Sequence, residues 1–206
     1  MNKYKFNLLL WGISLLTPVL IFSNYDQLKF DKITISEGLS QNEVRTIFQD
    51  KRGFMWFGTA DGLNRYDGYS IKQYKFSPLD TNSISDNFIW SITEDDSGHL
   101  WLGTSGGGLN EFIPECNKFI KYMTDPDDPN SLPSNKIIAV EKGASGNFWI
   151  GTDGGGLCRF NPQNGACKTF QHSEKKNSIN NNIINTILKV SEEELWIGTN
   201  QGLNIL

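Results

Sequence analysis

Short runs of alternating apolar and polar residues recur along the chain from residue 30 onward. Each run is about five residues long and rich in β-branched and aromatic side chains, which is typical of a half-buried strand. Turn signals such as Asp67-Gly68 separate the runs. In the first third of the chain, this pattern predicts a four-stranded antiparallel meander with strands at Val44 to Gln49, Phe54 to Gly58, Leu63 to Tyr66 and Ser70 to Phe76.

The meander is repeated. Its marker is the phrase Trp-x-Gly-Thr, in which the tryptophans are 45, 48 and 47 residues apart, at Trp56, Trp101, Trp149 and Trp196. An Asn lies 14 residues before each Trp, and a Gly-Leu pair follows six or seven residues after it. Self-similarity at this period is the signature of a repeat architecture. It predicts blades at about 42–77, 87–124 and 135–172, with a partial fourth at about 182–206.

The predicted fold class is therefore all-β, a β-propeller of four-stranded antiparallel blades that is partial in this chain. The alternating segment Phe30 to Ile35 is expected to be an orphan fourth strand, because it precedes Gly38-Leu39-Ser40-Gln41-Asn42 as the tail of a repeat would. This strand and the three-stranded last repeat could close a four-bladed ring. We favour an open arc, which would leave blade faces bare and be marginally stable alone.

The repeated residues are best explained by structure. Each Trp is expected to fill the wedge between one blade and the next, and each Gly-Thr pair fits a strand end where backbones crowd. Asp50 and Asp95 are interpreted as turn residues, because the later repeats do not keep them. The Gly-rich stretches 103–108 and 151–156 are followed by strands, whereas a phosphate-binding loop leads into a helix.

The first 23 residues predict a signal peptide. Lys3 and Lys5 precede a 15-residue apolar run, Leu8 to Phe22, which is short for a membrane span. An uncleaved anchor is the alternative, because Ile21 is not the small residue that a cleavage site prefers. Without this segment the chain has 17 bases and 23 acids, a net charge of −6. An exported acidic chain is a poor candidate for nucleic-acid binding.

Cysteine and histidine usage indicates neither a disulfide framework nor a metal site. Cys158 and Cys167 flank a turn and could be bonded or free, and Cys116 is the third cysteine. His99 and His172 lie in dissimilar parts of their repeats, so both are expected to be surface residues. We expect no cofactor, no metal and no catalytic residue.

A ligand site is therefore expected among residues that do not repeat, on the side where the loops between strands two and three meet those between blades. Aromatic rings and hydrogen-bonding side chains in such loops suit sugar rings. For Trp90, packing between blades is the favoured interpretation over ligand contact. The candidate residues for ligand contact are Arg45, Asp61, Trp90, Ser105, Asp153 and Asn200.

The motif from Gly38 to Gly68, with Asn42, Asp50, Gly53, Trp56 and Gly62-Leu63-Asn64-Arg65-Tyr66 at fixed spacing, resembles the two-component regulator propeller repeat. The resemblance covers residues 30 to 206. It implies part of a seven-bladed propeller on the extracytoplasmic side of a hybrid sensor histidine kinase. Such a sensor recognises oligosaccharides in the periplasm, signals through a phosphorelay and regulates glycan-utilisation genes.

The chain would then be the amino-terminal piece of such a sensor or a truncated gene product. Its expected partners are an oligosaccharide, the remaining blades or a second propeller, and a second copy in a dimer. The alternatives are a propeller lyase or glycosidase, which needs a His or paired acids at the shaft mouth, and a protein-docking propeller.

Overall fold

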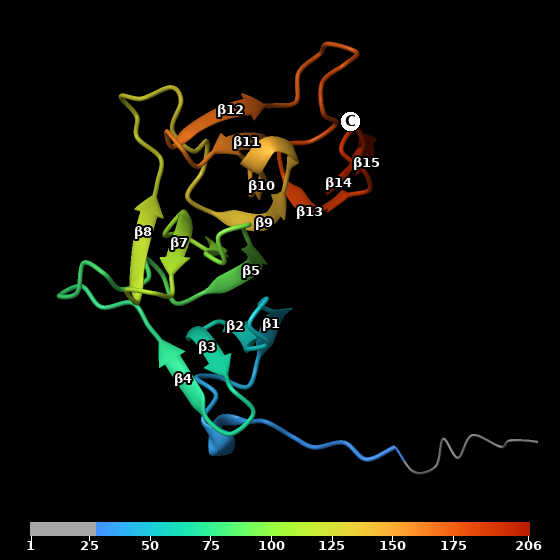
Figure 1. Cartoon of the computed structure of the whole chain (residues 1–206). Helices are drawn as coiled ribbons and strands as arrows, with labels where there is room; N and C mark the ends of the chain where they lie inside the picture. The colour runs from blue at the N-terminus through green and yellow to red at the C-terminus, as the bar shows by residue number, and fades with distance from the viewer. Residues whose placement is uncertain (1–27) are drawn as a thin grey trace, which may run out of the picture. The chain divides into compact units, whose positions relative to one another are not determined.

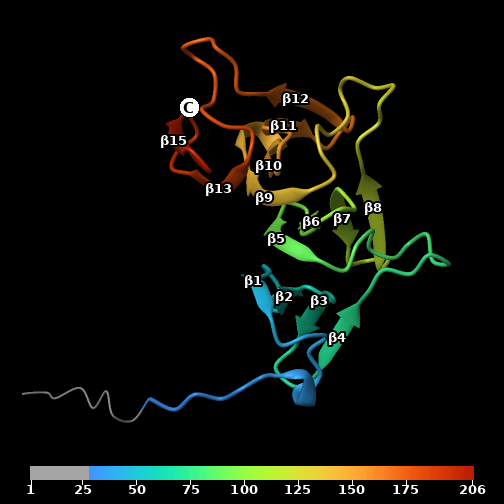
Figure 2. The same ribbon diagram turned by 180° about the vertical axis from the view of Figure 1, so that it is seen from behind.

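The computed structural model describes residues 28–206, so the predicted signal peptide lies outside the described residues. Residues 33–206 form a compact unit. This unit is built from four antiparallel sheets in which neighbouring strands follow chain order, three with four strands and one with three (Figures 1 and 2). These sheets are the blades of a β-propeller, as the repeat predicts. Within the described residues, no helix is long and apolar enough to cross a membrane.

The strands lie close to their predicted positions. Blade 1 contains β1 (Val44–Gln49), β2 (Met55–Thr59), β3 (Gly62–Tyr66) and β4 (Ile71–Tyr74). Blade 2 contains β5 (Ile89–Glu94), β6 (Leu100–Thr104), β7 (Leu109–Ile113) and β8 (Lys118–Tyr122). Blade 3 contains β9 (Ile137–Lys142), β10 (Phe148–Thr152), β11 (Leu157–Asn161) and β12 (Ala166–Phe170). Blade 4 contains β13 (Ile184–Lys189), β14 (Leu195–Thr199) and β15 (Gly202–Ile205). Residues 28–206 also contain two short 3-10 helices, η2 (Ile35–Glu37) and η3 (Ala144–Gly146).

The tryptophans of the first two blades fill the spaces between blades. Trp56 is fully buried, and its ring centroid lies 5.6 Å from that of Phe112 in blade 2. Trp101 is buried in the same way against Phe148 and Phe160 of blade 3, at 4.7 and 5.7 Å. The indole N–H of Trp56 donates to Asp50 Oδ2 at 2.8 Å, so the wedge also satisfies its polar atom.

The glycine of each Trp-x-Gly-Thr phrase is required by close packing between blades. A Cβ at Gly58 would lie 2.9 Å from Ile89 Cβ, the first residue of the next inner strand. A Cβ at Gly103 would lie 2.8 Å from Ile137 Cγ2, and one at Gly151 would lie 2.6 Å from Ile184 Cγ2. None of these glycines has a positive φ. Crowding, rather than backbone conformation, therefore explains the residue.

The repeated asparagines join successive blades. Asn87 accepts the Phe76 N–H at its side-chain oxygen (2.7 Å) and the Gly62 N–H at its backbone oxygen (2.7 Å). Asn135 and Asn182 make the equivalent side-chain bonds to Thr124 and His172 at 2.8 and 2.6 Å. Each Asn therefore closes the loop that leads into its own blade, as the structural interpretation predicts.

The expected orphan strand at Phe30 to Ile35 is wrong. Residues 28–34 form no strand, and Ile35 begins the helix η2 with Thr34 as its capping residue. A strand needs a partner, and no described strand lies beside this segment. The end of the segment still follows the repeat, because Asn42 Oδ1 accepts the Ile35 N–H at 3.0 Å, just as Asn87 accepts that of Phe76.

The blades form an open arc rather than a closed ring. Inner strands pack in sequence, β1 against β5, β5 against β9 and β9 against β13. The face of blade 1 opposite blade 2 is bare, since Ile47 is 64% exposed while its equivalent Ile92 is 8% exposed. At the other end, Trp196 is 37% exposed because no described blade covers it. Its expected role as a wedge between blades is therefore not fulfilled here.

These two environments of one repeat position give a matched test. Trp101→Ala should lower the free energy of unfolding by about 3–5 kcal/mol, because it empties a packed wedge. Trp196→Ala should cost less than about 1.5 kcal/mol, because half-exposed side chains lose little on truncation. Chemical denaturation of the two purified variants measures the difference. Equal losses would contradict the assignment of Trp101 as the interblade wedge.

Candidate functional site

The loops that carry the candidate residues lie on one side of the blades. In an antiparallel meander, the turn from the second to the third strand and the loop entering the first strand are on the same side. Backbone bonds tie the two together, because the N–H groups of Ser105, Asp153 and Asn200 donate to Phe88, Lys136 and Ile183 at 3.1, 3.0 and 3.3 Å. We call this side the entry face.

A β-bulge interrupts each inner strand at its second residue. The register of the first two strands shifts between Val44 and Thr46, and at the equivalent position in the other three blades. Bulges turn a side chain out of its regular direction and are common beside binding sites. The four bulged residues differ in chemistry, since they are Arg45, Trp90, Ile138 and Asn185.

Two of the six candidate residues come together at these bulges. The Arg45 guanidinium carbon lies 5.1 Å from the ring centroid of Trp90 and 5.3 Å from that of Phe88. The two rings are 4.8 Å apart, and Glu43 holds the guanidinium at 2.6 Å. The Trp90 indole nitrogen is buried and has no hydrogen-bond partner in the described part of the chain. We call Arg45, Phe88 and Trp90 the bulge cluster.

The other four candidates are held in separate places along the entry face. Asp61 binds Lys75 at 2.6 Å, and Asp153 binds Lys136. Asn200 accepts the Asn185 side-chain N–H at 2.8 Å, which links it to the bulge of blade 4. Ser105 is anchored through its backbone, and no hydrogen bond of its hydroxyl is found among the described residues. The six residues therefore do not form one pocket.

The Gly-rich turns are built as turns, as predicted. Thr104 and Thr152 each donate their hydroxyl to the glycine oxygen at the far end of the turn, Gly108 and Gly156, at 2.7 Å. A strand follows each turn. A phosphate-binding loop would instead present its N–H groups to a ligand at the start of a helix.

One groove lies away from the bulge cluster. It measures about 650 Å³ and runs beside the unpaired edge of β15, between Ile205, Ile197 and the blade 3 residues Leu157 and Phe170. In the other blades a fourth strand pairs with this edge. None of the six candidates lines the groove.

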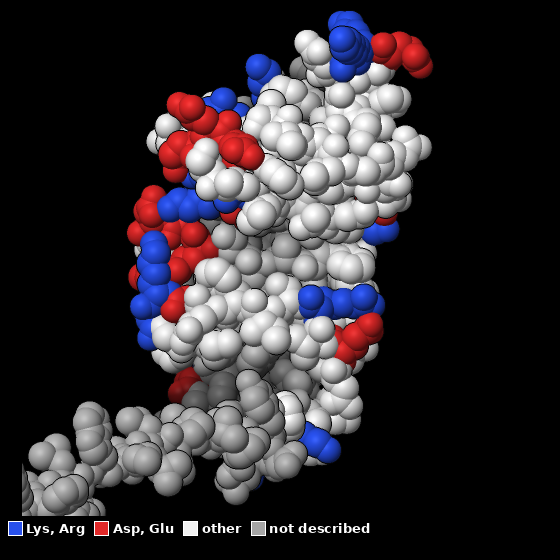
Figure 3. All heavy atoms as spheres, turned by 90° about the vertical axis from the view of Figure 1, so that its right-hand side faces the viewer, with Lys and Arg blue, Asp and Glu red and all other residues white. Residues whose placement is uncertain are grey.

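Charged side chains gather along one edge of the view in Figure 3, while most of the surface that faces the viewer is uncharged. The viewer looks from the right-hand side of Figure 1, where the first strands β1, β5 and β13 lie. A surface with few charged residues suits a neutral ligand better than a highly charged one.

Sequence reasoning missed residues that only the fold brings into contact. Phe88 completes the bulge cluster, and Asn185 supports Asn200, yet neither belongs to a repeated motif. The available signal was that Asn185 occupies the same repeat position as Arg45 and Trp90, and that Phe88 lies two residues before Trp90. Cys158 and Cys167 form a disulfide with their Cα atoms 5.7 Å apart, which decides between the two alternatives left open, and Cys116 is free.

His99 also departs from its expected state as an unpartnered surface residue. It is half-buried, and its Nδ1 lies 2.8 Å from Glu111 Oε1. The second oxygen of Glu111 accepts the Tyr122 hydroxyl at 3.1 Å. Burial, and secondly the Glu111 charge, raise the pKa of Tyr122, so its hydroxyl remains a donor. His172 is exposed, with Nδ1 2.9 Å from the Ile179 oxygen.

Comparison with known proteins agrees with the fold. A family profile described as "two component regulator propeller" matches residues 38–61, 83–106 and 131–154. Over 56 residues the chain is 50% identical to histidine kinase P4 of Formosa agariphila, which is 27% of this chain and 4% of that protein.

Solved structures agree as well. The extracellular domain of a putative hybrid two-component system from B. thetaiotaomicron is 29% identical, with a TM-score of 0.75 over 85% of this chain and 25% of that one. A second such domain, of a putative one-component system from the same organism, is 24% identical, with a TM-score of 0.69 over 84% of this chain and 25% of that one, and shows the fold alone.

The fold and repeats thus define a β-propeller. The resemblance seen in the sequence is confirmed, because three segments of this chain match the two-component regulator propeller repeat. The chain spans about a quarter of the solved domains that it matches and 4% of the curated relative.

The contact of Arg45 with two rings can be tested by Arg45→Met, which keeps an aliphatic side chain and removes the cation. The free energy of unfolding should fall by about 0.5–1 kcal/mol, the contribution of a part-exposed cation–π contact. Arg159→Met is the matched control, because Arg159 is exposed in blade 3. Denaturant titration measures both. A loss at Arg45 no larger than at Arg159 would contradict the contact.

Proposed function

We propose that the chain is the ligand-sensing propeller part of a two-component sensor, and that it binds oligosaccharides outside the cytoplasm. The relatives support the sensor role, because the 29% identical domain is described as the extracellular part of a hybrid two-component system. The matched portion of each relative is small, so the kinase activity of a longer protein and its effect on glycan-utilisation genes are part of this proposal.

The bulge cluster is the observation that carries the ligand assignment. Sugar rings bind through apolar C–H faces on aromatic rings and through hydroxyls on fixed polar groups. Phe88 and Trp90 supply the rings, and Arg45 supplies guanidinium donors held in place by Glu43. The unpaired Trp90 indole N–H would gain a partner from a sugar hydroxyl. Asp61 and Lys75 extend the polar surface at the next turn.

Structure gives no specific support to a lyase or glycosidase. His99 precedes β6, beyond the end of β5 opposite its bulge, and His172 lies in the loop that enters blade 4. The two histidines therefore do not converge on one point of the entry face. We propose that the chain binds its ligand without chemical change.

Calorimetric titration of the purified chain with a panel of oligosaccharides tests this function. Trp90→Ala and Arg45→Ala should weaken binding about 30-fold or more, since truncation at a binding hot spot costs about 2 kcal/mol. Ile138→Ala is the matched control, because Ile138 occupies the same bulge position in blade 3 but offers no hydrogen bond.

Mass spectrometry of the same mixtures checks for products, and none are expected. Shortened or unsaturated sugars would show an enzyme instead of a sensor. The absence of binding by every oligosaccharide, or undiminished affinity in both bulge-cluster variants, would contradict the proposed site.

A further inference from the structure

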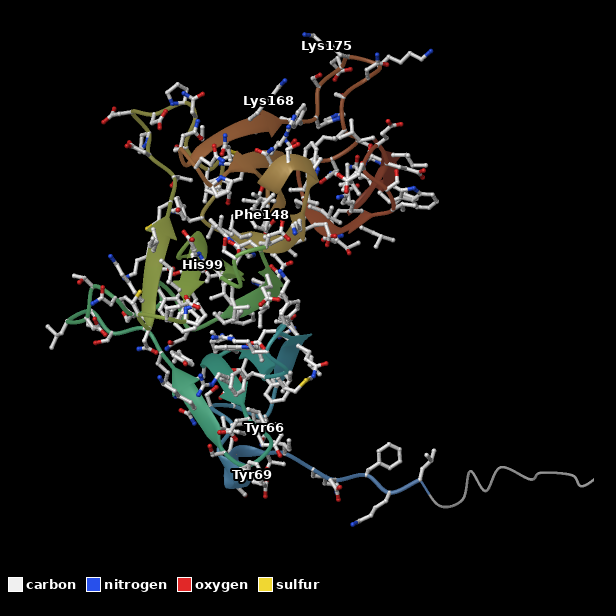
Figure 4. All side chains as sticks on the ribbon, in the orientation of Figure 1. Tyr66, Tyr69, His99, Phe148, Lys168 and Lys175 are labelled. Carbon is white, nitrogen blue, oxygen red and sulfur yellow. A yellow bond between two sulfur atoms is a disulfide. The ribbon has the colours of Figure 1, made fainter. Side chains whose placement is uncertain are left out.

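A second group of functional side chains lies on the side of blade 2 opposite the entry face. His99, Asp95 and Glu111 each offer a ligand atom, and these atoms all lie within 4.8 Å of one another. Asp95 and His99 belong to the turn from the first to the second strand, and Glu111 lies on the third strand, β7. Another carboxylate, Glu115, belongs to the turn from the third to the fourth strand. Figure 4 labels His99 within blade 2. All three residues of the group are half-buried.

Blade 2 differs from its neighbours at these positions. In blade 1, Phe54 lies two residues before Trp56, and Arg65 pairs with Trp56 across β2 and β3. There they form a cation–π contact, with the guanidinium carbon 4.6 Å from the ring centroid. In blade 3 the same positions hold Asn147 and Arg159. Blade 2 replaces these with His99 and Glu111, so the fold itself does not require an imidazole beside a carboxylate here.

The geometry points to a site for a divalent first-row transition-metal ion, such as Zn²⁺, held by His99 Nδ1, Glu111 Oε1 and Asp95 Oδ2. We propose this site as independent of ligand sensing. Nδ1 lies 2.8 Å from the Glu111 oxygen and 3.9 Å from the Asp95 oxygen. A tetrahedral ion with bonds of about 2.1 Å places its ligand atoms roughly 3.4 Å apart. Small side-chain movements therefore bring these atoms to ligand distances.

Neighbouring groups already orient the three ligands as metal sites require. The Tyr122 hydroxyl donates to Glu111 Oε2 at 3.1 Å, and the Trp101 indole donates to Asp95 Oδ2 at 3.0 Å. The other Asp95 oxygen accepts the N–H groups of Ser97 and His99. These contacts fix the carboxylates before an ion arrives, which reduces the entropy lost on binding.

The second imidazole nitrogen has a suitable carboxylate within reach. Nε2 lies 3.9 Å from Glu115 Oε2, and the Glu115 side chain is 64% exposed and free to move closer. A proton on Nε2 that bonds to Glu115 leaves Nδ1 as the unprotonated ligand atom. Without the ion, the single ring proton is on Nδ1 and bonds to Glu111. When the ion binds, that proton leaves Nδ1 for solvent and a proton is taken up at Nε2, so the hydrogen bond between Nδ1 and Glu111 is replaced by two metal bonds with no net change in ring protons. Three protein ligands leave the fourth position to water.

The choice of ion follows from the ligand types. One imidazole with two carboxylates suits Zn²⁺ and its neighbours in the first transition row, whereas Ca²⁺ and Mg²⁺ prefer oxygen ligands alone. Cys116 is one residue beyond Glu115 and has an exposed thiol that would bind zinc by itself. Every arm of the test therefore carries Cys116→Ser.

Calorimetric titration of the purified chain with Zn²⁺ alone tests the site. One ion should bind per chain, and Co²⁺ should give the visible absorption of a four-coordinate complex. The double variant His99→Asn with Glu111→Arg reproduces the pair that blade 3 already folds with, and it should weaken binding more than about 100-fold, as expected for two lost ligands. Glu115→Gln should weaken it about 10-fold.

His172→Asn is the matched control and should bind zinc like the parent chain, since the His172 ring contacts only the Ile179 backbone oxygen and lies in the loop that enters blade 4. Should the double variant fail to fold, as judged by circular dichroism, His99→Asn alone carries the test. Zinc uptake that is equal in the His99 variants and the parent, or absent in the parent at micromolar zinc, would overturn the proposal.

Discussion

The close approach of each blade to the next is the constraint on which this structure depends. Gly58, Gly103 and Gly151 leave no room for a Cβ, because the first isoleucine of the following inner strand occupies that space. Near the inner strands, the glycine backbone of one sheet therefore contacts an isoleucine side chain of the next sheet. Farther from the inner strands, the two sheets diverge. The tryptophan two residues earlier fills the wider part of the gap. Glycine and tryptophan are thus two parts of one wedge, and neither can vary alone.

These packing roles of the repeated residues leave few positions free for function. The Trp, the Gly and the Asn at each blade entry are committed to packing or to hydrogen bonds between blades. The bulged residue of each inner strand is not, because it is the extra residue that the ladder leaves unpaired. It is therefore the place where side chains as different as Arg45, Trp90, Ile138 and Asn185 can coexist in equivalent blades.

Most of the fold could be predicted from the sequence because the repeat reports the same local interactions four times. Strand positions, turns and the wedge follow from residues near one another in sequence. The strand expected at Phe30 to Ile35 failed for a different reason, since pairing depends on a partner that alternation alone does not guarantee. Some contacts could be predicted only with knowledge of the register between strands and blades. They are the contacts of Arg45 with Phe88 and Trp90, and of His99 with Glu111. Spacing in the sequence places Arg45 and Trp90 at equivalent repeat positions, but it does not show that their side chains touch.

The two proposed sites are separated by the length of one inner strand. Trp90 lies near the start of β5, and Asp95 follows directly after its end. Five residue steps at about 3.4 Å each place the two roughly 17 Å apart, so one bound metal ion cannot contact both. Ile89, Ile92 and Glu94 of this strand are buried, and Lys51 of blade 1 donates its N–H to Glu94 at 3.1 Å. Because β5 packs against both β1 and β9, it moves as a rigid element. It can therefore couple the two sites only if the whole of blade 2 shifts against its neighbours. The glycine and tryptophan wedges oppose such a shift, which favours sites that act independently.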